Sequence, residues 1–175
     1  MPRKISRREF VRTSTAAGVA VGASTTVFAK APAIQTNTIK PVVVASNNGN
    51  VYKNGGAEVG VQKAFNLITK GGDVLDALIA GVNLCELDPA DTSVGYGGLP
   101  NADGIVQLDS CCMHGPTRRA GGVASIEGVR TPSLVAKAVL EVTDHHLLVG
   151  KGAQEFARNM GLKVEDDLNT DKSRA

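Results

Sequence analysis

The residues best suited by type and spacing to bind a ligand or take part in catalysis lie at positions 93–101. These positions read Ser-Val-Gly-Tyr-Gly-Gly-Leu-Pro-Asn. Three glycines within four positions let the backbone either present N–H groups to a ligand or bring another segment close. The Ser93 hydroxyl beside them can donate or accept a hydrogen bond. A glycine-rich turn that binds nothing is the alternative. The surrounding polar connection, residues 88–104, is long for a compact domain, and such loops are usually functional or mobile.

Other polar residues predict less chemistry. His145 and His146 could act as bases or metal ligands, but polar cover of a helix end is the simpler interpretation. Gly150-Lys151-Gly152 is too short to match the loops that cradle phosphates. Asp109 lies within an apolar strand and must find hydrogen-bond donors there, so it is expected to pin neighbouring backbone rather than transfer protons. No nucleophile, base and orienting acid come together by local spacing.

The three cysteines do not form an obvious framework. Cys111 and Cys112 are adjacent and would face opposite sides of a strand, while Cys85 ends a helical pattern. We expect unpaired structural thiols. The segment Cys-Cys-Met-His that ends at His114 lacks a second ligand pair at zinc spacing, so neither a metal nor a cofactor is expected.

The first 33 residues have the layout of an export signal. Arg7 and Arg8 precede a weakly apolar stretch at positions 13–29, and small residues follow it. The arginine pair, with Phe10 two positions on, resembles the twin-arginine type, whose receptor passes folded proteins. An N-terminal membrane anchor is the alternative, although the stretch falls short of the ~20 apolar residues that span a bilayer. We expect cleavage after Ala33 and a periplasmic location.

The composition of the full sequence limits the class of protein. The 175 residues suffice for one domain or part of a larger one. With 42% hydrophobic and 21% charged residues, the chain is neither wholly disordered nor a polytopic membrane protein. The formal net charge is only +2 and aromatic residues make up 3%, so no nucleic-acid partner is expected.

The pattern of apolar residues and turn signals predicts a mixed α/β layer structure. Asp73 is a candidate N-cap, and Thr131 followed by Pro132 is a typical helix start. Residues 163–175 carry no packing signal. The expected elements are strand 41–46, helices 57–69 and 74–87, strands 105–113 and 120–126 as an antiparallel pair, helix 131–142, strand 147–149 and helix 152–160.

Several segments recur in an order that resembles the glycosylasparaginases, also called aspartylglucosaminidases. The resemblance covers residues 40–168, in an expected hydrolase region 34–168 followed by a polar tail, 169–175. It rests on the motif at 93–101, on Gly71-Gly-Asp-Val-Leu-Asp-Ala, Leu108-Asp, Gly122-Val-Ala, Thr131-Pro-Ser-Leu-Val-Ala-Lys-Ala-Val-Leu, and His146-Leu-Leu-Val-Gly-Lys-Gly-Ala-Gln-Glu-Phe-Ala.

The resemblance implies an N-terminal nucleophile hydrolase of α+β type, an αββα four-layer sandwich. Such enzymes cut themselves before a Thr, which begins the β subunit and acts as nucleophile with its own amino group as base. They hydrolyse the amide between an Asn side chain and N-acetylglucosamine, and in this family they form an (αβ)2 assembly. Within this chain, Ser93 matches a serine that lines the substrate pocket, and Asn47 stands where better-studied members carry an aromatic residue.

One departure from the family pattern is decisive for the expected activity. The self-cleavage sequence His-Asp-Thr is absent, and Thr170 lacks its context. We therefore expect an α-subunit-like part that is inactive by itself because the β subunit carries the nucleophilic Thr. Two alternatives stay open: a non-catalytic truncated remnant, or part of a plant-type asparaginase or isoaspartyl peptidase. Asn47 also leaves open a smaller amide or a differently shaped sugar as substrate.

Overall fold

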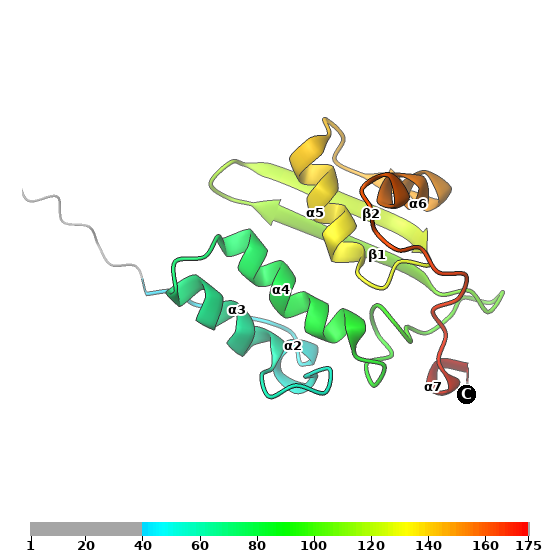
Figure 1. The fold of residues 1–175 in the computed structure, drawn as a ribbon, viewed down its shortest axis with the longest axis horizontal. Helices are drawn as coiled ribbons and strands as arrows, with labels where there is room; N and C mark the ends of the chain where they lie inside the picture. The colour runs from blue at the N-terminus through cyan, green and yellow to red at the C-terminus, as the bar shows by residue number, and fades with distance from the viewer. Residues whose placement is uncertain (1–39, 175) are drawn as a thin grey trace, which may run out of the picture. The chain divides into compact units, whose positions relative to one another are not determined.

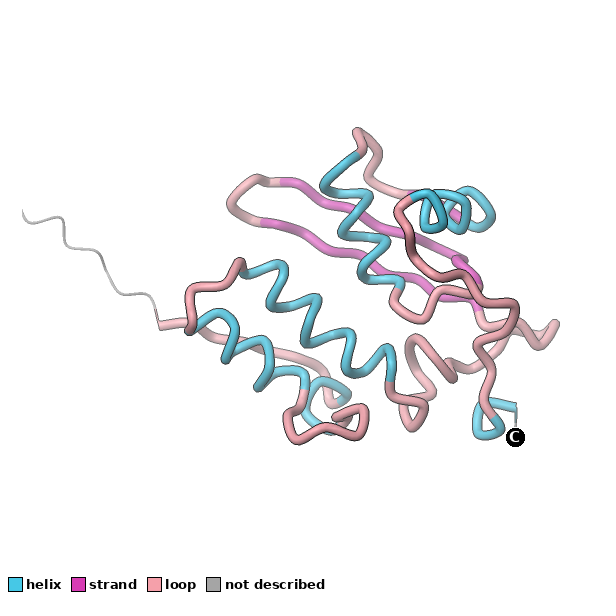
Figure 2. The backbone as a smooth tube through the Cα atoms, in the orientation of Figure 1, coloured by secondary structure: helices cyan, strands magenta, loops and turns pink. Residues whose placement is uncertain are grey.

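A computed structural model describes residues 40–174, in which helices pack on a small mixed sheet (Figures 1 and 2). Arg7, Arg8 and the whole expected export signal lie outside the described residues, so the signal stays a prediction. Among residues 40–174, no helix combines the length and the apolar character needed to cross a bilayer.

The sheet has three strands in the order β1-β2-β3. Strand β1 (Gln107–His114) pairs antiparallel with β2 (Arg119–Glu127), which pairs in parallel with the short β3 (Leu148–Val149). The three predicted strands in this region are confirmed, with ends shifted by one or two residues. The first two form a hairpin because the intervening residues close a tight turn, in which Arg118 N donates to Gly115 O over 3.1 Å.

One face of the sheet is covered by α5 (Pro132–Val142) and α6 (Gly150–Asn159), which lie side by side across it (Figure 1). Their apolar sides bury the main core, in which Val123, Ile126, Val135 and Val139 are at most 1% exposed. Residues of β1 alternate between the two faces, so Cys111 and Met113 project from the opposite, exposed face.

Helix α4 (Val74–Leu87) begins where the sequence predicts, because the Asp73 carboxylate caps it by accepting a hydrogen bond of 3.0 Å from Asp76 N. On one side Leu75 and Ile79 pack with Leu140 of α5. On another side lies α3 (Gly60–Thr69), which starts three residues later than predicted.

Helix α4 leaves part of its apolar surface uncovered among the described residues. Its Leu78 is 37% exposed and its Val82 is 45% exposed. The helix is therefore apolar around much of its circumference, but packs on only part of it.

The predicted strand 41–46 is wrong for the described residues. This segment is extended but has no ladder partner, and its Val42 and Val44 are 78% and 86% exposed. A strand requires a neighbour that accepts its hydrogen bonds, which sequence pattern alone cannot supply. The short helix α2 (Asn48–Val51) follows, where turn residues are found in the sequence.

Residues 163–174 pack against the rest of the chain, although their sequence carries no packing signal. Leu168 is 2% exposed and joins the main core. The segment ends in the short helix α7 (Asp171–Arg174), in which Ser173 is buried. Gly97 N donates to Leu168 O over 2.9 Å, so this segment is tied to the glycine-rich motif.

Candidate functional site

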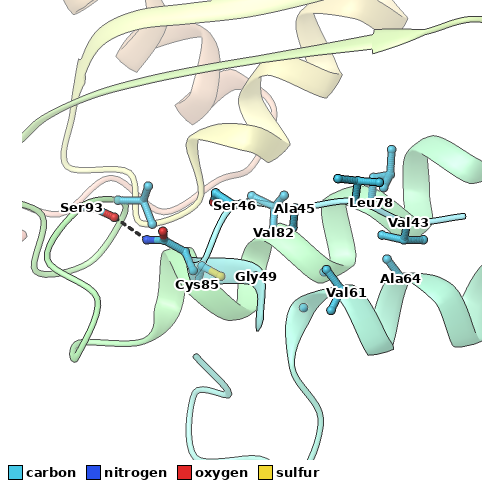
Figure 3. A pocket seen from close by; sticks show the side chains of 15 residues that line it. Val43, Ala45, Ser46, Gly49, Val61, Ala64, Leu78, Val82, Cys85 and Ser93 are labelled. Carbon is cyan, nitrogen blue, oxygen red and sulfur yellow. Dashed lines mark hydrogen bonds between the residues drawn. The ribbon is translucent and has the colours of Figure 1, made fainter. Parts of the chain in front are cut away.

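A pocket of about 410 Å³ lies between the extended segment before α2, helices α3 and α4, and the first residues of the glycine-rich motif (Figure 3). Most of its wall is apolar. The polar atoms gather at one end, where Ser93 and Asn48 meet. The remaining wall consists of Val43, Val44, Ala45, Ser46, Gly49, Gly60, Val61, Ala64, Leu78, Gly81, Val82, Cys85 and Val94.

Ser93 is held at this end by two neighbours that sequence analysis did not nominate. Its Oγ donates to Asp91 Oδ1 over 2.6 Å and accepts from Asn48 Nδ2 over 2.6 Å, the contact marked by a dashed line in Figure 3. Asn48 Nδ2 also donates to Asp91 Oδ2 over 2.7 Å. Asp91 is only 1% exposed, so its carboxylate lies behind Ser93 rather than in the open pocket.

The Asp91-x-Ser93 spacing was a signal that could have revealed this arrangement. Asp91 Oδ1 also accepts the Ser93 N–H over 3.0 Å. An Asp that bonds the backbone two residues on is a common turn. Asn48 gave no such signal, because its partners lie more than 40 positions away.

The glycines of the motif could either present N–H groups to a ligand or allow another segment to come close. The structure shows the second role. Tyr96 N donates to Glu86 O over 2.7 Å, and a Cβ on Gly95 would collide with the same carbonyl. Gly95 and Gly97 have φ of +58° and +87°, which L residues rarely adopt. The glycines thus bring the motif close to α4 and to residue 168, and the N–H groups of Tyr96 and Gly97 bond protein carbonyls.

Below the motif, Glu86 is a buried carboxylate that the sequence did not single out. It is 3% exposed, and it accepts hydrogen bonds from Ser133 N, Ser133 Oγ and Asn83 Nδ2. Burial raises the pKa of Glu86, and the hydrogen bonds from Ser133 and Asn83 oppose that rise. Because Ser133 lies in the first turn of α5, Glu86 joins that helix end to α4.

An arginine fastens the other side of the motif. The Arg130 guanidinium lies 3.7 Å above the Tyr96 ring and makes hydrogen bonds of 2.7 and 2.9 Å to the Glu165 carboxylate. The hydrogen bond from Arg130 lowers the pKa of Glu165 despite partial burial. Residues on both sides therefore fix the loop that presents Ser93.

The remaining nominated residues lie elsewhere. The structure places Asn48, rather than the exposed Asn47, in the pocket wall. His145 and His146 are exposed in the connection after α5, and His146 Nδ1 lies 3.3 Å from Ala120 O. Asp109 is exposed, not buried as expected, but its Oδ1 accepts the Ser125 N–H over 2.7 Å, which confirms the predicted backbone role.

Lys151 is exposed in the first turn of α6. All three cysteines carry free thiols. Burial raises the pKa of the Cys85 thiol, and the negative charges of Asp91, Asp88 and Glu86 add to the rise, so this pocket residue is kept in the unreactive thiol form. Within residues 40–174, no group of three or more His, Cys, Asp or Glu side chains is placed to bind a metal.

Comparison with known proteins decides the family, because residues 37–175 match the asparaginase family. The chain belongs to this family. It is 42% identical over 137 residues to an N(4)-(beta-N-acetylglucosaminyl)-L-asparaginase of Elizabethkingia miricola, covering 78% of this chain and 38% of that protein. This agrees with the resemblance to glycosylasparaginases, and the partial coverage fits their N-terminal part.

Other asparaginase relatives have different names. A plant-type L-asparaginase of Pyrococcus abyssi is 44% identical over 105 residues, covering 60% of this chain and 34% of that protein. An isoaspartyl peptidase/L-asparaginase of Rattus norvegicus is 36% identical over 107 residues, covering 59% and 32%. The chain thus spans between about a third and two fifths of the length of these curated relatives.

Proposed function

We propose that this chain is the α-subunit-like part of an exported amidohydrolase of the glycosylasparaginase type. Its substrate is the amide between an Asn side chain and N-acetylglucosamine. The nucleophile is a Thr at the start of a β subunit, and the His-Asp-Thr sequence in which such a cut would fall is absent from the 175 residues. Membership of the asparaginase family supports the amidohydrolase reaction.

The observation that carries the proposal is the placement of the Ser93 hydroxyl at the polar end of an apolar pocket. A hydroxyl fixed by two side chains can orient a substrate without reorganising when the substrate binds. In this mechanism Ser93 binds, whereas the Thr of the β subunit attacks with its own amino group as base, and donors outside this chain stabilise the oxyanion.

The four-layer sandwich and the (αβ)2 assembly belong to the same proposal. The exposed face of the sheet carries Cys111 and Met113, the latter 72% exposed, and a second sheet packed there would bury them. The backbone of residues 42–45 pairs with no strand among the described residues, which leaves it open to a further strand. Export through Arg7 and Arg8 would deliver this assembly, already folded, to the periplasm.

A plant-type asparaginase or isoaspartyl peptidase is the second candidate, supported by the relatives of those names. The two candidate functions differ in the substrate that is hydrolysed fastest. The glycosylasparaginase proposal expects faster hydrolysis of N-acetylglucosaminyl-asparagine than of free asparagine or a β-aspartyl dipeptide, and the opposite order favours the second candidate.

The deciding experiment starts with the codons that follow Ala175. An in-frame His-Asp-Thr, followed by cleavage before that Thr and hydrolysis of N-acetylglucosaminyl-asparagine, would support the proposal. A stop codon, with no separate β chain and no hydrolysis by the native protein, would instead support the non-catalytic remnant.

A further inference from the structure

The single proton of the Ser93 hydroxyl is already committed. It is donated to Asp91 Oδ1 over 2.6 Å, while one lone pair accepts from Asn48 Nδ2 over 2.6 Å. A hydroxyl has one donor and two acceptor positions. What Ser93 can still offer a pocket ligand is therefore one lone pair, and no proton.

The direction of these hydrogen bonds is set by Asp91. Its two oxygens accept from Ser93 N, Ser93 Oγ and Asn48 Nδ2. If the Asn48 amide were flipped, its Oδ1 would face the Asp91 carboxylate. The hydrogen bond from Asn48 to Ser93 Oγ would then lose its N–H donor. Both amide protons of Asn48 are therefore used, one toward Asp91 and one toward Ser93. Its Oδ1 stays available as an acceptor beside the free lone pair of Ser93 Oγ.

We propose that Asp91 is a positioning residue that, together with Asn48, locks the Ser93 hydroxyl as a hydrogen-bond acceptor toward the pocket. The polar end of the pocket then binds a group that donates, such as an ammonium, an amide N–H or a hydroxyl, and disfavours a carboxylate. This inference deepens the proposed function and rests on it, since Ser93 is assigned there as a substrate contact.

Burial separates this role from general-base catalysis by Asp91. The carboxylate is 1% exposed and lies behind Ser93. It receives three hydrogen bonds, two of them from donors other than the Ser93 hydroxyl. If Asp91 were to take the Ser93 proton, Ser93 would become an alkoxide beside a pocket lined mainly by apolar groups, with Asn48 and the newly protonated Asp91 as the donors that contact it.

The test is a double-mutant cycle in the native protein that contains this chain, with hydrolysis of N-acetylglucosaminyl-asparagine as readout. Asp91→Asn and Ser93→Ala are each expected to raise KM by about tenfold, the effect of one lost hydrogen bond to a fixed group, and to change kcat much less. Because Asp91 acts through Ser93, adding Asp91→Asn to Ser93→Ala should raise KM no further.

Asp88→Asn is the matched control. Asp88 lies three residues away and also accepts backbone N–H bonds, from Asn54 and Ala90, but it does not contact Ser93. The KM of the Asp88→Asn variant is expected to stay at the wild-type value. The positioning role is overturned if Asp91→Asn raises KM equally with and without Ser93, or if it abolishes kcat while leaving KM unchanged, as loss of a base would.

A second readout keeps the inference separate from the proposed function. In protein with isotopically labelled asparagine, the side-chain amide resonances of Asn48 should shift in Asp91→Asn and in Ser93→Ala, but not in Asp88→Asn. If the wild-type protein hydrolyses none of the asparagine derivatives, the proposed function fails, and this spectrum still decides the hydrogen-bond arrangement. The inference would be overturned if the side-chain amide resonances of Asn48 shifted in neither Asp91→Asn nor Ser93→Ala.

Discussion

The backbone carbonyl of Glu86 accepts a hydrogen bond of 2.7 Å from the N–H of Tyr96, which ties the glycine-rich motif to the last turn of α4. The same carbonyl is the atom that a Cβ on Gly95 would strike. The close approach of the two segments therefore depends on the absence of one side chain, and Ser93 lies two residues before it.

Gly95→Ala is expected to destabilise the protein strongly. The variant carries the strain of a left-handed backbone, about 1–2 kcal/mol, and it must also move α4 or the motif. Gly104→Ala is the matched control, because Gly104 also has a positive φ, +78°, but has no atom within 4 Å of its Cβ position. Urea denaturation of the native protein should show a clearly larger loss for Gly95→Ala, and equal losses would contradict the close-approach role.

The pH dependence of stability should carry a contribution from Glu86. Burial raises the pKa of Glu86 above its ordinary value of 4.5 in the folded state, so the folded protein holds this proton more tightly than the unfolded chain. The stabilisation is fully present below the unfolded pKa and is lost as the pH rises through the raised folded pKa. Glu165, whose pKa is lowered, acts in the opposite sense.

Glu86→Gln removes this titration. The difference in unfolding free energy between wild type and variant, followed from acid to neutral pH, should therefore move against the wild type as the pH rises. A flat difference for Glu86→Gln would show that its carboxyl titrates alike in both states.

The elements that sequence pattern predicted are those whose stabilising contacts are local. Helix α4 has its own cap in Asp73, and the β1–β2 hairpin closes through a short turn. Residues 41–46 resembled a strand by composition but find no ladder partner. Leu168 was missed because a single apolar residue among charged ones has no periodicity, although it is buried in the core.

The candidate site also combines residues that local sequence reveals with residues that only long-range contacts reveal. Ser93 was predicted from its motif, whereas Asn48 and Glu86 act through contacts to residues more than 40 positions away. Asp91 was within reach of the sequence, because its bond to Ser93 N is a local turn. Long-range pairs of this kind can only be found once the fold places them together.

Residues 34–175, expressed alone, are expected to be aggregated or loosely packed. The exposed side chains of Val42, Val44 and Met113 lie on an unpaired extended segment and an uncovered sheet face. Size-exclusion chromatography and calorimetry would measure this, and replacing both valines with Lys should reduce aggregation. A soluble monomer with a sharp cooperative melt would contradict the expectation.

Export is expected to depend on the arginine pair. Replacing Arg7 and Arg8 with Lys should deplete the periplasmic fraction, since the twin-arginine receptor reads these residues. Arg118, in the hairpin turn, and Arg119, the first residue of β2, form a matched pair whose replacement with Lys should leave the distribution unchanged. Unchanged periplasmic levels of the Arg7 and Arg8 variant would refute the twin-arginine assignment.

The isolated chain is expected to hydrolyse neither glycosylasparagine nor an aspartyl anilide above the rate in buffer. Amide hydrolysis near neutral pH needs an activated nucleophile, a base and donors for the oxyanion. The structure brings Asp91 to Ser93, but this carboxylate also bonds Ser93 N and Asn48, and it is buried. In the proposed mechanism the nucleophile and base both come from the Thr of the β subunit.

Supplying a family β chain that begins with Thr should restore turnover wherever the two halves pair. In the restored complex, Ser93→Ala should weaken substrate binding more than it slows the chemical step, because Ser93 contacts the substrate and does not attack it. The measurement is KM and kcat for glycosylasparagine in both complexes. Hydrolysis by the lone chain that disappears in Ser93→Ala would instead make Ser93 the nucleophile, with Asp91, 2.6 Å from its Oγ, as the base.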